Sequence, residues 1–97
     1  MYKILIVEDD IDLKEGLEFA LKEDGYEVLV AETKKDAIIC YKSHNFDLVL
    51  MDCNLPDGSG FELCTDIRQN SNVAILMLTA RDGELDEVKA LNLGVDQ

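Results

Sequence analysis

The residues best suited to chemistry are acids that directly follow apolar segments. Glu8, Asp9 and Asp10 follow one such segment, and Asp52 follows another. Carboxylates held close together repel one another, so a cluster of them is costly unless a cation lies among them. Oxygen ligands with open water positions suit a hard divalent cation such as Mg²⁺ or Mn²⁺. If the two segments lie side by side, the sequence predicts a divalent-cation site.

The elements that must position these acids alternate along the chain. Strands are predicted at four apolar runs, residues 3–7, 27–31, 46–51 and 73–78. The first run is continuously apolar, as expected for a strand that is buried on both faces. Apolar residues at helical spacing predict four helices, with stripes that include Leu17, Ala37, Leu63 and Val88. Strands that alternate with helices indicate an α/β fold with a doubly wound parallel sheet and right-handed crossovers.

Short polar motifs mark the ends of the predicted helices. Gly25 suits a left-handed cap after the first helix. Residues 33–36 resemble a capping box with an unusually short acid, and Ser59 and Glu62 form a second capping box. Residues 53–59, which contain the single proline and Gly58, are predicted to form a loop.

Length and charge limit the classes of function. The 97 residues allow one domain, and the net charge of −12 should repel nucleic acid phosphates and anionic membranes. No apolar run approaches the roughly 20 residues of a membrane span, and the start is too short for a signal peptide. The three cysteines, Cys40, Cys53 and Cys64, lack metal-finger spacing and are expected to be reduced core thiols of a cytosolic protein.

The predicted sheet has one edge where ligands are expected. In doubly wound sheets, ligands bind outside the carboxyl ends of the strands, near the point where the strand order reverses. Thr79 and Ala80 end the last apolar run, so a hydroxyl group would join the acids there. The alternative is that each acid simply ends a strand and faces solvent. Acids after two strands, together with Thr79, favour the cation site.

Four segments carry a resemblance to a known family. The chain resembles the receiver domain of two-component response regulators, most closely those with a winged-helix DNA-binding output domain, from Tyr2 to about Asp96. The matching segments are ILIVEDD at 4–10, DLVLMD at 47–52, LPDGSG at 55–60 and LMLTA at 76–80. The resemblance implies a flavodoxin-like sheet of order 2-1-3-4-5.

The resemblance also implies a metal site and its ligands. Asp9 would hold Mg²⁺ (or Mn²⁺) directly, and Glu8 would hold it through water. The phosphoacceptor Asp52 and the main-chain carbonyl of Asn54 would complete the set of protein ligands.

The remaining implied roles concern the phosphoryl group. It would come from the phosphohistidine of a sensor histidine kinase in the cytoplasm, and Asp52 would receive it. The Thr79 hydroxyl and the Ala80 amide would bind its oxygens. The domain would catalyse only its own phosphorylation and dephosphorylation, and would switch a transcriptional output domain that this chain lacks.

The chain departs from the family at its end. Receivers normally continue into a fifth strand, a Lys-Pro pair and a fifth helix, whereas this sequence stops at Gln97, and Lys89 does not match that lysine. Residues 1–97 are therefore expected to be an incomplete receiver of order 2-1-3-4. The uncharged strand 73–78 would then be an edge, favouring a homodimer through strand four and helix four. Alternatively, residues 82–97 rearrange to cover the gap.

Three other classes of protein share some of these features. A haloacid-dehalogenase phosphatase needs a second acid two residues after the first, where this chain has Asn54. A pseudo-receiver would use the fold without phosphorylation, and the intact acid set argues against it. A nucleotide site at residues 58–60 lacks the third glycine and follows the wrong strand.

Overall fold

Four apolar segments form the strands of one parallel sheet. A computed structural model describes residues 2–78, and its main sheet consists of β1 (Lys3–Val7), β2 (Glu27–Ala31), β3 (Leu48–Asp52) and β6 (Ala74–Leu78). The strands lie in the order β2-β1-β3-β6, and all three pairings are parallel. The predicted α/β sheet and its order 2-1-3-4 are therefore confirmed for the described part of the chain.

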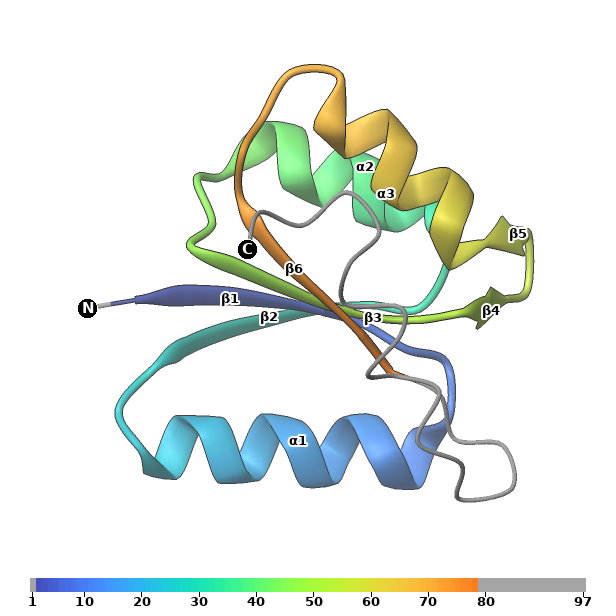
Figure 1. Ribbon diagram of the computed structural model, residues 1–97. Coiled ribbons are helices and arrows are strands. Elements are labelled where there is room, and N and C mark those ends of the chain that lie inside the picture. The colour runs from blue at the N-terminus through green and yellow to red at the C-terminus, as the bar shows by residue number, and fades with distance from the viewer. Residues whose placement is uncertain (1, 79–97) are drawn as a thin grey trace.

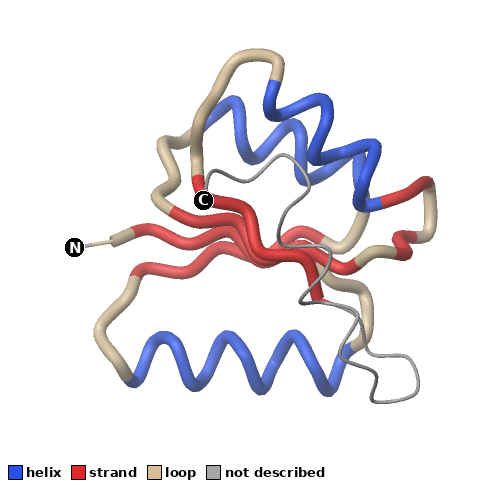
Figure 2. Tube along the Cα trace, in the orientation of Figure 1, coloured by secondary structure: helices blue, strands red, loops and turns tan. Residues whose placement is uncertain are grey.

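Helices cover both faces of this sheet. Helix α1 (Ile11–Glu23) lies on one face, and α2 (Lys34–Ser43) and α3 (Gly60–Arg68) lie on the other (Figures 1 and 2). The predicted fourth helix lies outside the described residues. No helix within residues 2–78 is long and apolar enough to cross a membrane.

Two apolar layers explain why the strands are continuous apolar runs. In β1, Leu5 and Val7 belong to the cluster that packs against α2 and α3, whereas Ile4 and Ile6 belong to the cluster beneath α1. All four side chains are buried, at 3% exposure or less. Alternate residues of a strand point to opposite faces, so a strand covered on both faces must be apolar at every position.

The helix ends follow the predicted motifs. Gly25 has φ 94°, and its N–H donates to the Lys22 carbonyl (3.0 Å) while the Tyr26 N–H donates to the Leu21 carbonyl (3.1 Å). These two bonds form a Schellman motif, which confirms the predicted left-handed cap. The capping box of Ser59 and Glu62 is present at α3.

Some predicted boundaries are wrong. Strand β3 begins at Leu48, two residues later than predicted, and includes Asp52. Just before it, the Asp47 side chain accepts the Lys3 N–H (2.8 Å), and the Asp47 N–H donates to the Lys3 carbonyl (2.8 Å). Strand β6 begins one residue later than predicted, at Ala74. The predicted loop 53–59 contains a small antiparallel hairpin, described next.

The hairpin consists of two very short strands. β4 (Asn54–Leu55) pairs with β5 (Gly58–Ser59), and the turn between them contains Pro56 and Asp57. It leads directly from Asp52 and Cys53 into α3. The hairpin therefore lies at the carboxyl edge of the sheet.

Candidate functional site

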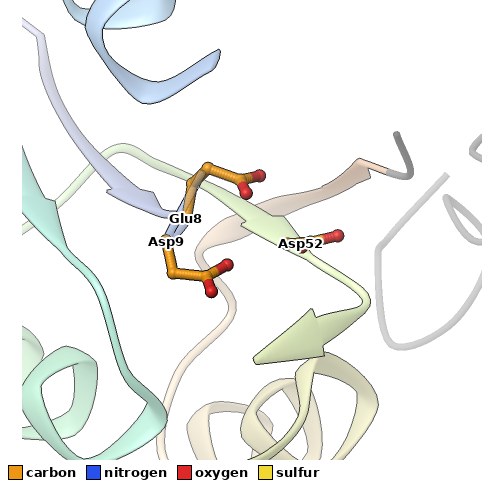
Figure 3. Close-up of side chains that lie close together, drawn as sticks. All are labelled: Glu8, Asp9 and Asp52. Carbon is orange, nitrogen blue, oxygen red and sulfur yellow. The ribbon is translucent and has the colours of Figure 1, made fainter. Parts of the chain in front are cut away.

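The sheet register brings acids from β1 and β3 together. Val7 pairs with Met51, so the residues that follow Val7 lie next to Asp52. Glu8, Asp9 and Asp52 each offer a carboxylate oxygen, and these oxygens all lie within 4.8 Å of one another (Figure 3). The structure thus places three of the predicted site residues in one acidic cluster.

Glu8 is the buried member of the acidic cluster. Its side chain is 1% exposed, and its Oε2 accepts the Asp10 N–H at 3.0 Å. Its Oε1 is buried and has no hydrogen-bond partner among residues 2–78. Burial raises the pKa of Glu8, the Asp10 N–H lowers it, and the nearby Asp52 and Asp9 carboxylates raise it further, so that the pKa lies above its ordinary value of 4.5.

This donor set fits a hard divalent cation. A buried carboxylate oxygen without a donor is costly, and a cation would compensate it. Asp9 is exposed and Asp52 is half-buried, so the cluster also meets solvent, which leaves room for water ligands. Three carboxylates with water positions are the ligands that Mg²⁺ or Mn²⁺ prefers.

Asp10 has a structural role that differs from those of Glu8 and Asp9. It is the N-cap of α1, and its Oδ1 accepts the Leu13 N–H at 2.9 Å. The Asp10 carboxylate therefore caps the first turn of α1, and Asp10 is not a member of the acidic cluster. Its place three residues before Leu13, where the apolar stripe begins, is the sequence signal of a cap.

Gly60 shapes the other side of the site and was not predicted. A Cβ atom at this position would lie 2.0 Å from the main-chain carbonyl oxygen of Asp52. The Gly60 N–H also donates to the Cys53 carbonyl at 2.8 Å. The start of α3 therefore packs directly on the backbone that carries Asp52, and only glycine permits this contact.

The other predicted site residues are less completely placed. Asn54 lies exposed on β4. Thr79 and Ala80 lie outside the described residues, so their roles remain predictions. Of the three cysteines, Cys64 is buried, and Cys40 and Cys53 are half-buried.

Known proteins share this arrangement. A parallel sheet of this order with acids at its carboxyl edge defines a flavodoxin-like α/β domain. The family model for the response regulator receiver domain matches residues 4–97, and the chain belongs to this family. This membership favours the receiver over the phosphatase and nucleotide-site alternatives.

Solved receiver structures agree with the assignment. The non-phosphorylated HemR receiver domain from Leptospira biflexa is 38% identical, with a TM-score of 0.81 over 98% of this chain and 77% of that one. Response regulator TrrA from Thermotoga maritima, in complex with Mg²⁺-BeF, is 33% identical, with a TM-score of 0.84 over 99% and 83%. A two-component response regulator from Clostridium difficile is 32% identical, with a TM-score of 0.86 over 99% and 79%.

Proposed function

We propose that this receiver domain accepts a phosphoryl group on Asp52 from the phosphohistidine of a sensor histidine kinase. The observation that carries the proposal is the acidic cluster of Glu8, Asp9 and Asp52 at the carboxyl edge of a receiver sheet. The related TrrA protein is in complex with Mg²⁺-BeF, which supports the binding of a divalent ion by this domain. An intact acid set also favours phosphorylation over a pseudo-receiver role.

Asp52 and the metal ligands have different roles in the proposed phosphoryl transfer. A carboxylate oxygen of Asp52 forms the new bond to phosphorus while the N–P bond of the phosphohistidine breaks and the imidazole leaves with its electron pair. Glu8, Asp9, Asp52 and the Asn54 carbonyl would hold Mg²⁺, which when bound neutralises charge on the phosphoryl oxygens.

Residues beyond β6 complete the proposed site. The Thr79 hydroxyl and the Ala80 N–H donate to the phosphoryl oxygens. The domain catalyses only its own phosphorylation and dephosphorylation, and acts on no separate substrate.

The family and the net charge support a proposal about where the domain works and what it regulates. We propose that the domain works in the cytoplasm and switches a winged-helix transcriptional output domain. With a net charge of −12, it does not itself contact nucleic acid. Within residues 2–78, β6 pairs only with β3 and carries no charge, so β6 and the fourth helix predicted from the sequence form the proposed homodimer surface. Sedimentation over a dilution series tests that surface, and a monomer at all concentrations would contradict it.

Intact mass spectrometry tests the phosphoacceptor directly. After incubation with acetyl phosphate and Mg²⁺, the wild type should gain one phosphoryl group, and chelation of Mg²⁺ should prevent the gain. Asp52→Ala should gain none, whereas Asp12→Ala, which removes an exposed acid in α1, should be labelled normally. Equal labelling of Asp52→Ala, or none in the wild type, would refute the proposal.

A further inference from the structure

Asp57 makes a long-range contact to the start of α2. Its Oδ1 accepts the Lys34 N–H at 2.7 Å, and its Oδ2 accepts the Lys35 N–H at 3.0 Å. These are the first two N–H groups of α2, which have no partner within a helix. The N-cap residue Thr33 accepts a different N–H, that of Asp36. The first turn of α2 is thus capped by two separate parts of the chain.

The bonds to Asp57 join an ionised acid to the positive end of a helix. They lower the pKa of Asp57 below its ordinary value of 3.8, and the Lys34 N–H has a larger effect than the Lys35 N–H. Hydrogen bonds to an ionised acceptor are stronger than neutral ones, and the helix dipole acts in the same direction. The carboxylate therefore ties its own turn firmly to α2.

The turn that carries Asp57 needs this support. It joins β4 to β5, and each strand has only two residues. An isolated two-stranded hairpin is marginally stable at best, and one this short is less so. Asn54, whose carbonyl is the proposed metal ligand, lies on β4 of the same hairpin.

A second contact from α2 holds the other strand of the hairpin. The Lys34 Nζ lies 3.2 Å from Oε1 of Glu62, at the start of α3. A Cβ atom at Gly58 would lie 3.1 Å from both Lys34 Cδ and Glu62 Oε1, so this pair packs closely over β5. The N-terminus of α2 therefore contacts both the turn and β5.

We propose that Asp57 is a positioning residue for the metal site, which clamps the hairpin carrying Asn54 to the N-terminus of α2. This inference rests on the proposed function, because it assumes that the Asn54 carbonyl binds the metal. Asp57 itself touches neither the metal nor the phosphoryl group. Loss of the clamp should weaken metal binding although every ligand is still present.

Thr33→Ala provides a matched control for Asp57→Ala. Both changes remove a cap from the same helix end, but only Asp57 connects that end to the hairpin. Isothermal titration with Mg²⁺ should show affinity weakened about tenfold in Asp57→Ala and unchanged in Thr33→Ala. Asp57→Asn keeps one acceptor oxygen and should recover part of the affinity. Unchanged affinity in Asp57→Ala, or an equal loss in Thr33→Ala, would overturn the inference.

Hydrogen exchange without metal separates this inference from the proposed function. The Gly60 N–H, bonded to the Cys53 carbonyl across the base of the hairpin, should exchange faster in Asp57→Ala than in Thr33→Ala. Equal exchange in the two variants would overturn the clamp whatever the metal does. A wild-type protein that neither binds Mg²⁺ nor becomes labelled on Asp52 would instead refute the proposed function.

Discussion

Burial and neighbouring acids act on Glu8 in the same direction. Both keep its pKa in the folded protein above the ordinary value of 4.5 that the unfolded chain has. Between these two pKa values, the folded protein binds more protons than the unfolded chain. The metal-free protein should therefore lose stability as pH rises from 4.5 through the raised pKa of Glu8.

Replacement of Glu8 by glutamine tests this pH dependence. Glu8→Gln cannot ionise, so its metal-free stability should change less with pH above 4.5 than that of the wild type. Urea unfolding at several pH values, with a chelator present, measures the difference. Glu23→Gln makes the same chemical change at an exposed site and should follow the wild type. A wild-type slope in Glu8→Gln would contradict the prediction.

Asp57 affects stability in a separate pH window. Its pKa is lowered by the Lys34 and Lys35 N–H groups, so its contribution is present above 3.8 and is lost as pH falls through the lowered value. The sign is opposite to that of Glu8. The two effects can therefore be distinguished in one pH series.

A pair of glycine substitutions tests the close contact at the site. Gly60→Ala would place a Cβ atom 2.0 Å from the Asp52 carbonyl oxygen, so the backbone must shift. We expect a loss of about 3 kcal/mol in unfolding free energy, together with slower phosphorylation of Asp52. Gly16 lies inside α1 with nothing within 4 Å of its Cβ position. Gly16→Ala should stabilise the protein by about 1 kcal/mol, and a loss of stability there equal to that of Gly60→Ala would contradict the explanation.

At the scale of elements, the end of α1 offers a further test. Gly25 has φ 94° and open space at its Cβ position, so a substitution there meets strain but no clash. Gly25→Ala should cost about 1 kcal/mol because an L residue is disfavoured in this conformation. Thermal unfolding measures the loss, and Gly25→Asn should lose less, since asparagine tolerates left-handed backbone better. No loss in the alanine variant would show that the cap relaxes.

The sequence predicted the first two strands because strands of a sheet covered by helices on both faces appear as apolar runs. Residues 3–7 and 27–31 match β1 and β2 residue for residue. At β3, an apolar pattern could not reveal that the Asp47 side chain, just before the strand, accepts the Lys3 N–H. The hairpin of β4 and β5 is too short to leave any periodicity. Its turn makes a long-range contact that no local pattern predicts, from Asp57 to Lys34, 23 residues away.

The acidic cluster was predictable for a similar reason. Parallel strands place their carboxyl ends at one edge, so acids after the first and third runs had to meet if those strands were neighbours. The sequence pattern by itself did not show which acid of residues 8–10 caps α1, although the family resemblance assigned the metal to Glu8 and Asp9 and not to Asp10. It also did not reveal Gly60, because a backbone contact leaves no pattern in side-chain type.

At the scale of the whole molecule, whose net charge is −12, Mg²⁺ should stabilise the fold both by general screening and by specific binding. The two contributions can be measured separately. General screening should raise the melting temperature of any such acidic chain, and matched ionic strength in KCl should reproduce this part. Specific binding at ten times the dissociation constant should add about 1.4 kcal/mol more. Asp9→Ala should lose only the specific part, and Asp12→Ala should keep it. If Asp9→Ala responds to Mg²⁺ as the wild type does, the site is wrongly placed.

The position of β1 has a consequence for the synthesis of the chain. β1 lies between β2 and β3, and Ile4 pairs with Leu48, so its second neighbour is translated long after the strand itself. When the nascent chain has been translated only as far as α2, one edge of β1 is therefore still unpaired. The apolar core beneath α2 and α3 includes residues of β6, so it can be completed only after β6 has been translated. Parallel pairing across such distances is slow, and open edges invite wrong partners. Stable folding should thus begin only after residue 78 has been translated. Until then, the partly synthesised chain would need protection from aggregation at the ribosome.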